Sequence, residues 1–134
     1  MTTSDAALQP IPVATERIGR SIIGCAITAH RILGPGFKEI IYERAFCLEL
    51  DACGIRYECE KKILVPYRTW QIPGHTIDLI VEGCVIAELK SVSRLKKVHE
   101  RQVVSYLKAT QLRLGFLINF NVPIVKQGIR RIVL

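Results

Sequence analysis

Residues 77–90, IDLIVEGCVIAELK, form an apolar segment that nevertheless carries Asp78, Glu88 and Lys90. The dipeptide Glu82-Gly83 in its middle is typical of a tight turn, so the segment predicts a hairpin of two buried strands. A charge that is buried without a partner is costly. The three charged groups must therefore pair with one another, stay hydrated or hold a metal ion, and this requirement constrains the fold more than any other feature.

The register of this hairpin decides whether Asp78 and Glu88 meet. Side chains alternate between the two faces of a strand, so Glu88 and Lys90 share a face. A two-residue turn would not direct Asp78 to that face, whereas a three-residue loop with Gly83 in a bulge would. Asp78 would then lie opposite or diagonal to Glu88, at about 5–8 Å.

Two converging carboxylates would form an oxygen site that suits Mg²⁺ or Mn²⁺. A lysine beside them can position or activate a water molecule, which is the apparatus of metal-assisted phosphodiester hydrolysis. The alternative is purely structural: Glu88 and Lys90 form an ion pair, and Asp78 caps a turn.

Apolar periodicity along the rest of the chain predicts helices and strands that alternate in blocks. This order predicts an α/β fold in which helices pack on a mixed central sheet. The expected helices cover 14–36, where Gly34-Pro35 marks the stop, 38–54 and 95–111, and the expected strands cover 56–67, 75–81, 84–90, 114–120 and 128–134. Helical spacing places Ile22 and Ala29 on the inward stripe of the first helix, and Tyr42, Phe46 and Cys53 on that of the second.

Length and composition indicate a single domain over 14–134 that follows a flexible lead-in over 1–13. No apolar run is long enough to cross a bilayer and no signal sequence begins the chain, so we expect a cytoplasmic protein that is not bound to a membrane. The five cysteines are never spaced as CxxC, which favours buried, reduced thiols over a zinc site or disulfides. The net charge of +7 weakly favours a polyanionic partner.

The spacing Asp78-x9-Glu88-x-Lys90 on consecutive strands is similar to that of the PD-(D/E)xK nuclease superfamily. Ile77 stands where the first motif of that superfamily often has proline. The segment GFKEIIY, residues 36–42, matches the GxxExxY pattern that names a small family placed in the superfamily. The segments AHRILGPG, AELKSV, VHERQ, LGFLINFNVP and GIRRIVL also resemble that family, so the resemblance covers about 18–134.

The resemblance implies an α-β-β-β-α-β restriction-endonuclease-like core with an extra N-terminal helix. It implies that Asp78 and Glu88 hold Mg²⁺ or Mn²⁺, that Lys90 positions the attacking water, and that Glu39 joins the metal site. The implied activity is hydrolysis of DNA phosphodiesters. The alternative is a nucleic-acid-binding or protein-interaction module that keeps the fold without cutting, and a homodimer is left open.

The expected helix 95–111 carries two further candidates, Gln102 and Tyr106, on a stripe with Val98 and Ala109. This QxxxY spacing resembles a motif of the RecB-like exonuclease branch, in which it orients substrate or the catalytic lysine. The alternative is a structural hydrogen bond from Gln102 to the sheet backbone.

Basic residues cluster on and before the same helix, and they can contact phosphates or form its solvated face. The sequence shows no array of aromatic residues, so it gives no support for sequence-specific reading of single strands by stacking. The basic cluster consists of Arg94, Lys96, Lys97, Arg101 and Lys108.

Overall fold

The computed structural model describes residues 9–134, so residues 1–8 of the expected lead-in lie outside the described residues. The main-chain oxygens of Gln9 and Pro10 accept hydrogen bonds from the Arg113 guanidinium at 2.6 and 3.1 Å. The first described helix begins directly after this contact, at Val13.

The structure confirms the expected α/β class, with a five-stranded mixed sheet in the order β1-β2-β3-β4-β5. Strands β3 and β4 are parallel and are joined through a helix, while all other neighbouring strands are antiparallel. The elements are α2 (Val13–Leu33), α3 (Glu39–Ala52), β1 (Tyr57–Tyr67), β2 (Trp70–Val81), β3 (Val85–Lys90), α4 (Lys97–Thr110), β4 (Leu114–Asn119), the 3-10 helix η1 (Val125–Gly128) and β5 (Ile129–Val133).

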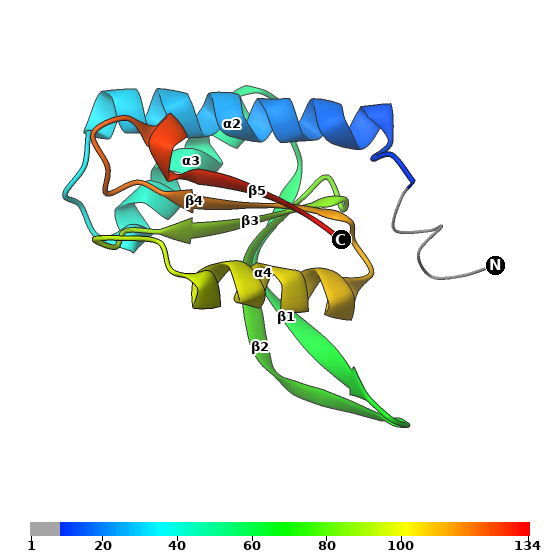
Figure 1. The fold of residues 1–134 in the computed structure, drawn as a ribbon. Coiled ribbons are helices and arrows are strands. Elements are labelled where there is room, and N and C mark those ends of the chain that lie inside the picture. Colours follow the sequence, from blue (N-terminus) through cyan, green and yellow to red (C-terminus); the bar gives the residue numbers. More distant parts are fainter. Residues whose placement is uncertain (1–8) are drawn as a thin grey trace.

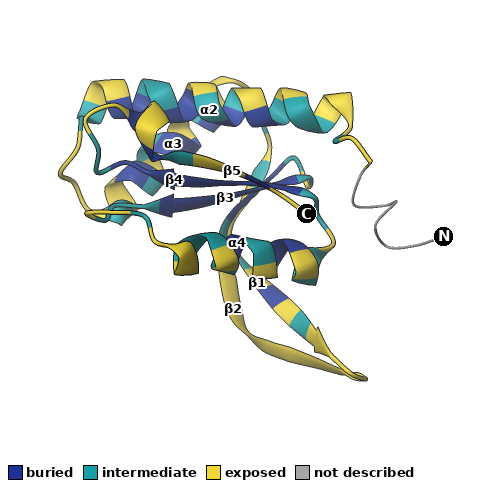
Figure 2. Ribbon diagram, viewed as in Figure 1, coloured by how far each residue is buried: buried dark blue, intermediate teal, exposed yellow. Residues whose placement is uncertain are grey.

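The sheet lies between two helical layers, with α2 and α3 on one face and α4 on the other (Figure 1). Each face has its own apolar core, and the central strands β3 and β4 are buried along almost their whole length (Figure 2). Gly115 on β4 lets α4 approach the sheet, because a Cβ there would lie 2.8 Å from Val103 Cγ1. No helix among residues 9–134 has both the length and the apolar character that a membrane crossing needs.

The predicted inward faces of the first two helices are largely confirmed. Ile22 and Ala29 are buried on α2, and Tyr42 and Phe46 are buried on α3. Cys53 was expected on the α3 stripe but is exposed, because the helix ends one residue earlier.

The expectation of buried thiols holds for only part of the cysteines. Cys25 and Cys47 are buried and Cys84 is half-buried, whereas Cys53 and Cys59 are exposed. All five are free thiols.

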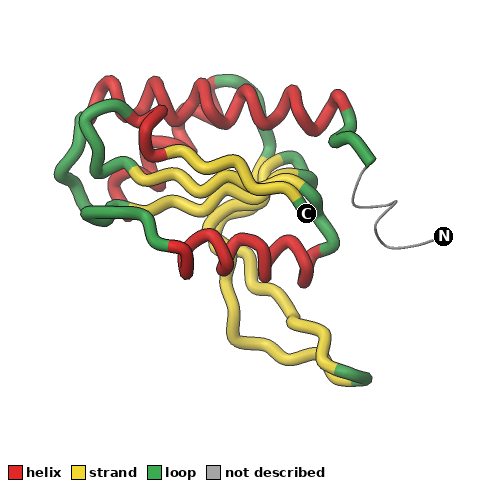
Figure 3. The backbone as a smooth tube through the Cα atoms, viewed as in Figure 1, coloured by secondary structure: helices red, strands yellow, loops and turns green. Residues whose placement is uncertain are grey.

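Strand β2 is longer than expected, because it begins at Trp70 and not at residue 75. Pro73 and Gly74 resemble strand breakers, and this part of the strand is exposed on both faces, so it lacks the alternation that identifies a half-buried strand. Residues 61–77 of β1, β2 and their turn therefore form a two-stranded arm that extends past α4 (Figure 3).

The β1–β2 hairpin changes layers along its length. Leu79 packs in the core under α2 and α3, whereas Ile77, two residues away, packs in the core under α4. Residues two apart normally share a face, so the hairpin is strongly twisted at Asp78. Glu60, which stands beside Asp78 on β1, adopts the left-handed φ of 49° at the same level. The crossing point of the hairpin thus brings two acidic residues together.

Candidate active site

The candidate site lies in a fork, where β2 diverges from β3. Their ladder runs from Val81–Val85 to Leu79–Ala87 and stops there. The loop between the strands, 82–84, has three residues, so the structure has the three-residue alternative. This register places Asp78 opposite Glu88, at the point where the two strands separate.

The two carboxylates take over the hydrogen bonds that the strands no longer make to each other. Glu88 Oε1 accepts the main-chain N–H of Asp78 at 2.8 Å. Asp78 Oδ2 accepts the main-chain N–H of Leu89, also at 2.8 Å. The fork is therefore closed by side chains, and both acids are fixed by the backbone of the opposite strand.

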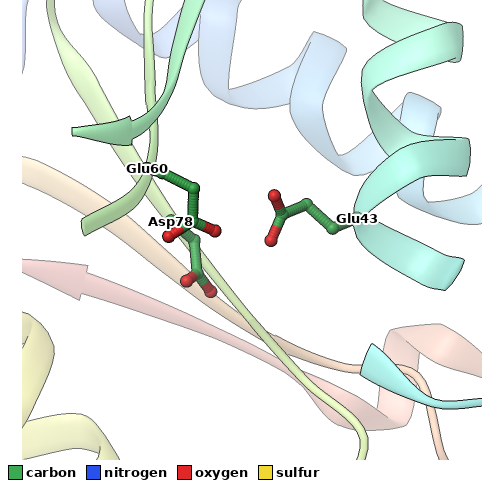
Figure 4. Close-up of side chains that lie close together, drawn as sticks. All are labelled: Glu43, Glu60 and Asp78. Atoms are coloured by element: carbon green, nitrogen blue, oxygen red, sulfur yellow. The ribbon is translucent and has the colours of Figure 1, made fainter. Parts of the chain in front are cut away.

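Three acidic side chains converge beside the fork: Glu43 from α3, Glu60 from β1 and Asp78 from β2 (Figure 4). Each offers one carboxylate oxygen, and these oxygens lie within 4.8 Å of one another. We call this group the carboxylate cluster. Such an all-oxygen donor set fits a hard divalent cation such as Mg²⁺, Mn²⁺ or Ca²⁺.

Sequence reasoning did not identify Glu43 or Glu60. Glu43 could have been found, because it lies one helical turn after Glu39 and so shares its face. Glu60 lies in the polar stretch ECEKK, and its approach to Asp78 depends on a left-handed φ that strand periodicity does not predict.

Glu39 and Glu88 lie near the cluster without contributing one of its three converging oxygens. Glu39 is half-buried at the start of α3, and burial, followed by the negative charge of Asp78, raises the pKa of its carboxyl. Glu88 is 3% exposed, and burial together with the Asp78 charge raises its pKa to about 8.

The carboxylate cluster itself favours protonation when no cation is bound. Burial and the adjacent Glu60 raise the pKa of Glu43 to about 7. Burial also raises the pKa of Asp78, although its hydrogen bond from Leu89 acts in the opposite direction. Crowded carboxylates that retain protons near neutral pH are groups whose charge a bound cation would compensate.

Lys90 is the last residue of β3 and lies next to the candidate site. Among residues 9–134 it has no ion-pair partner within 4.0 Å, so the expected alternative of a Glu88–Lys90 ion pair is not what the structure contains. Its ammonium nevertheless acts on the pKa values of Glu39, Asp78 and Glu88, lowering each of them. Lys90 is thus close enough to sense the acids without being neutralised by one of them.

Tyr42 of the GxxExxY pattern anchors the loop that leads into α3. Its hydroxyl donates to the carbonyl of Gly34 at 2.5 Å and accepts the N–H of Phe37 at 3.1 Å. Its ring is fully buried and stacks on Phe120 at a centroid distance of 4.7 Å. Gly36 supplies the left-handed φ of 107° that this loop requires. The tyrosine therefore positions the first turn of α3, where Glu39 lies.

The two candidates on α4, Gln102 and Tyr106, differ in burial and in their contacts. Tyr106 is buried, and its hydroxyl lies 3.2 Å from His75 Nδ1 on the arm. Burial, and then the charges of Glu88 and Asp78, raise the pKa of Tyr106 to about 12. Gln102 is half-buried one turn earlier on α4. Both side chains line a groove between α4 and the arm. Val98 and Ala109 line this groove too, so the four residues share one face of α4 as expected, although Val98 is 61% exposed.

The basic residues of the α4 region are all exposed, in agreement with either a phosphate-contacting or a solvated face. Lys96 caps the helix, and its main-chain N–H donates to His99 Nδ1 at 3.0 Å. Arg101 lines a groove with Tyr106, and Lys108 lines a neighbouring depression.

The sequence profile of the PD-(D/E)XK nuclease superfamily matches residues 16–132. Comparison with curated proteins and with solved structures gives no match. The match covers most of the chain, and the chain belongs to the PD-(D/E)XK nuclease superfamily.

The raised pKa values predict how metal binding depends on pH. A carboxyl whose pKa is higher in the folded state than in the unfolded chain stabilises the folded state. This stabilisation is complete at pH values below the ordinary pKa of 4.5. It is lost as the pH rises through the folded-state pKa, which is about 8 for Glu88. The metal-free protein should therefore lose stability between about pH 5 and pH 8. A cation displaces protons, so the gain in melting temperature with Mn²⁺ should be larger at pH 8 than at pH 6.

Thermal melts of matched glutamate variants test this prediction. At a hundred times its Kd, a ligand stabilises the folded state by about 2.7 kcal/mol. Glu60→Gln should lose most of the Mn²⁺ gain, whereas Glu58→Gln should keep it, because Glu58 pairs with Lys61 on the exposed part of the same strand. Equal gains in both variants would show that the carboxylate cluster is not the metal site.

Proposed function

We propose that the protein is a metal-dependent nuclease that hydrolyses DNA phosphodiester bonds. The observation that carries the proposal is the fork itself. There the carboxylate cluster and Glu88 lie within electrostatic range of Lys90, which has no ion-pair partner among the described residues 9–134. Membership of the nuclease superfamily supports the same conclusion. The match of residues 36–42 to GxxExxY leads us to place the chain in that branch of the superfamily.

Each acid has a role that follows from its position. Asp78 holds Mg²⁺ or Mn²⁺ together with Glu43 and Glu60. Glu88 supplies further negative charge from inside the fork, and Glu39 does so from the start of α3. The cation, when bound, polarises the scissile phosphate and lowers the pKa of an attacking water. The hydrogen bonds from the backbone fix Asp78 and Glu88, so little reorganisation is needed during the reaction.

Lys90 provides the positive charge next to the attacking water. Its ammonium is not held by a carboxylate within 4.0 Å in the described part of the chain, so it is free to contact the water and the phosphate oxygens. Gln102 contacts the nucleic-acid strand that leaves the site, since Gln102 lines the groove next to Tyr106. Lys96, Lys97 and Arg101 contact phosphates from the exposed side of α4.

We propose a cytoplasmic location, where the five free thiols stay reduced.

Cleavage assays test the proposed activity on linear, circular and single-stranded DNA with Mg²⁺ or Mn²⁺. Products should form with either metal and disappear with EDTA. The Asp78→Asn variant, purified in parallel, controls for a contaminating nuclease. If the wild type binds DNA but cuts none of these forms, the domain is a binding module that has kept the fold.

A further inference from the structure

The arm presents a surface that the catalytic proposal does not use. Its strands pair Val65 with Ile72 and Tyr67 with Trp70. Residues two apart on a strand share a face, so these two pairs lie on one side of the arm. Tyr67 and Trp70 are 55% and 63% exposed. The tip of the arm therefore displays two aromatic side chains next to each other.

A groove with a volume of about 380 Å³ lies between this side of the arm and α4. Ile63 and Val65 contribute apolar side chains from the arm, and Val98 does so from α4. Its inner end is formed by Tyr106, whose hydroxyl contacts His75 of the arm. His75 and Asp78 lie three residues apart on the same strand, β2. The groove thus leads from the arm toward the fork that holds the acids.

Positive charge surrounds this apolar floor. No acidic residue occurs between Glu60 and Asp78 in the sequence, although this stretch contains Lys62 and Arg68. The Arg68 guanidinium lies 5.8 Å from the centre of the Tyr67 ring. On the other side, α4 contributes Arg101 to the groove and Lys108 to the depression beside it. The groove therefore has an apolar floor, the aromatic residue Tyr106 at its inner end, and basic residues along its rim.

We infer that this groove binds an unpaired nucleic-acid strand next to the cleavage position, an inference that rests on the proposed nuclease function. A duplex stacks its bases internally and presents mainly its phosphates, so its base faces cannot pack against an apolar floor. An unpaired strand exposes both parts, and proteins that bind such strands combine a cationic groove with aromatic stacking surfaces. The bases pack against the floor and the Tyr67–Trp70 pair, and the phosphates contact Arg68, Arg101 and Lys108.

A second copy of the chain fits this surface poorly. Pro66 and Pro73 remove main-chain donors from both strands of the arm, and the register shifts between Ile63 and Val65. Prolines and bulges of this kind oppose the addition of another strand. The cationic rims of two identical arms would also repel each other. The charge complementarity favours a polyanion.

Trp70 is the only tryptophan in the chain, so its fluorescence reports directly on the arm. The experiment titrates the full chain in EDTA with three oligonucleotides: a single strand, a blunt duplex, and a duplex with a single-stranded overhang. We expect the single strand and the overhang to quench Trp70 and to bind at least about tenfold more tightly than the blunt duplex.

Variants locate the contact. Tyr67→Ala and Arg68→Ala should each raise the Kd for the single strand, by about tenfold for the lost stacking surface. The controls Ile32→Ala and Arg31→Ala remove one exposed apolar and one exposed basic side chain from α2, in the opposite layer, and should leave the Kd unchanged.

Equal affinity for the blunt duplex, or an unchanged Kd in both arm variants, would overturn the assignment. A Trp70 signal that depends on protein concentration without DNA would also overturn it, in favour of self-association. A chain that binds single strands through Trp70 but cuts nothing would overturn only the nuclease proposal. A chain that cuts DNA while Trp70 stays unquenched would overturn only the groove.

Discussion

Replacing Lys90 by methionine should reduce DNA cleavage at least about a hundredfold, because electrostatic stabilisation by one preorganised group is typically worth that much in rate. Methionine has a similar length and an apolar end, so the fold should be retained. Metal binding through the carboxylate cluster should also survive, since Lys90 is not one of its ligands. The assay compares initial cleavage rates at saturating DNA and Mn²⁺.

A second readout separates catalysis from mere charge balance. The Lys90 ammonium lowers the pKa values of Glu39, Asp78 and Glu88. Without it these pKa values rise further, so the pH at which Mn²⁺ begins to stabilise the protein should move upward. Lys126→Met is the matched control, because Lys126 is an exposed lysine in η1. If Lys90→Met and Lys126→Met cut at the same rate as the wild type, Lys90 has no catalytic role.

Replacing Tyr42 by alanine should destabilise the protein by about 3–5 kcal/mol, the usual loss for a fully buried aromatic side chain. The ring loses its stacking partner Phe120, and the loop that leads into α3 loses its anchor. Tyr42→Phe keeps the ring but removes the hydroxyl, so it should cost about 1–3 kcal/mol. Urea unfolding measures both free energies.

The control for the hydroxyl is Tyr57→Phe, since the Tyr57 hydroxyl donates to Asp51 at the surface at 2.8 Å. This change should cost less than Tyr42→Phe, because the remaining Asp51 carboxylate stays hydrated. Equal costs for the two variants would show that Tyr42 anchors the loop through its ring alone. In that case Glu39 would owe its position to packing and not to the two hydrogen bonds.

The order of elements could be predicted because it follows from local signals, whereas the meeting of Asp78 with Glu88 could be stated only as one of two alternatives for the turn. Buried strands and helices have distinct apolar periods, and a short loop restricts the register to few alternatives. Choosing the three-residue loop was not possible from the sequence, because Glu82 itself adopts a left-handed φ of 50° there. A glutamate is seldom found in that conformation.

The carboxylate cluster and the arm were missed for a shared reason. Both depend on the strong twist of the β1–β2 hairpin, which moves it from one layer of the fold to the other. Twist arises from packing along the whole hairpin, so no short stretch of sequence encodes it. The aromatic pair at the tip is likewise invisible in the sequence, because Tyr67 and Trp70 become neighbours only when the strands pair.

The hydrogen bonds that Asp78 and Glu88 accept from the backbone bear on how such a domain can evolve. A lineage that stopped cutting nucleic acid would still need an acceptor at both positions to keep β2 and β3 joined at the fork. Asparagine and glutamine satisfy that need, whereas alanine leaves two main-chain N–H groups without partners. Selection for folding alone would thus preserve a hydrogen-bond acceptor, acidic or amide, at both positions in inactive descendants. In such relatives the acids of the fork would be poor markers of activity, and an unpaired Lys90 would be the better one.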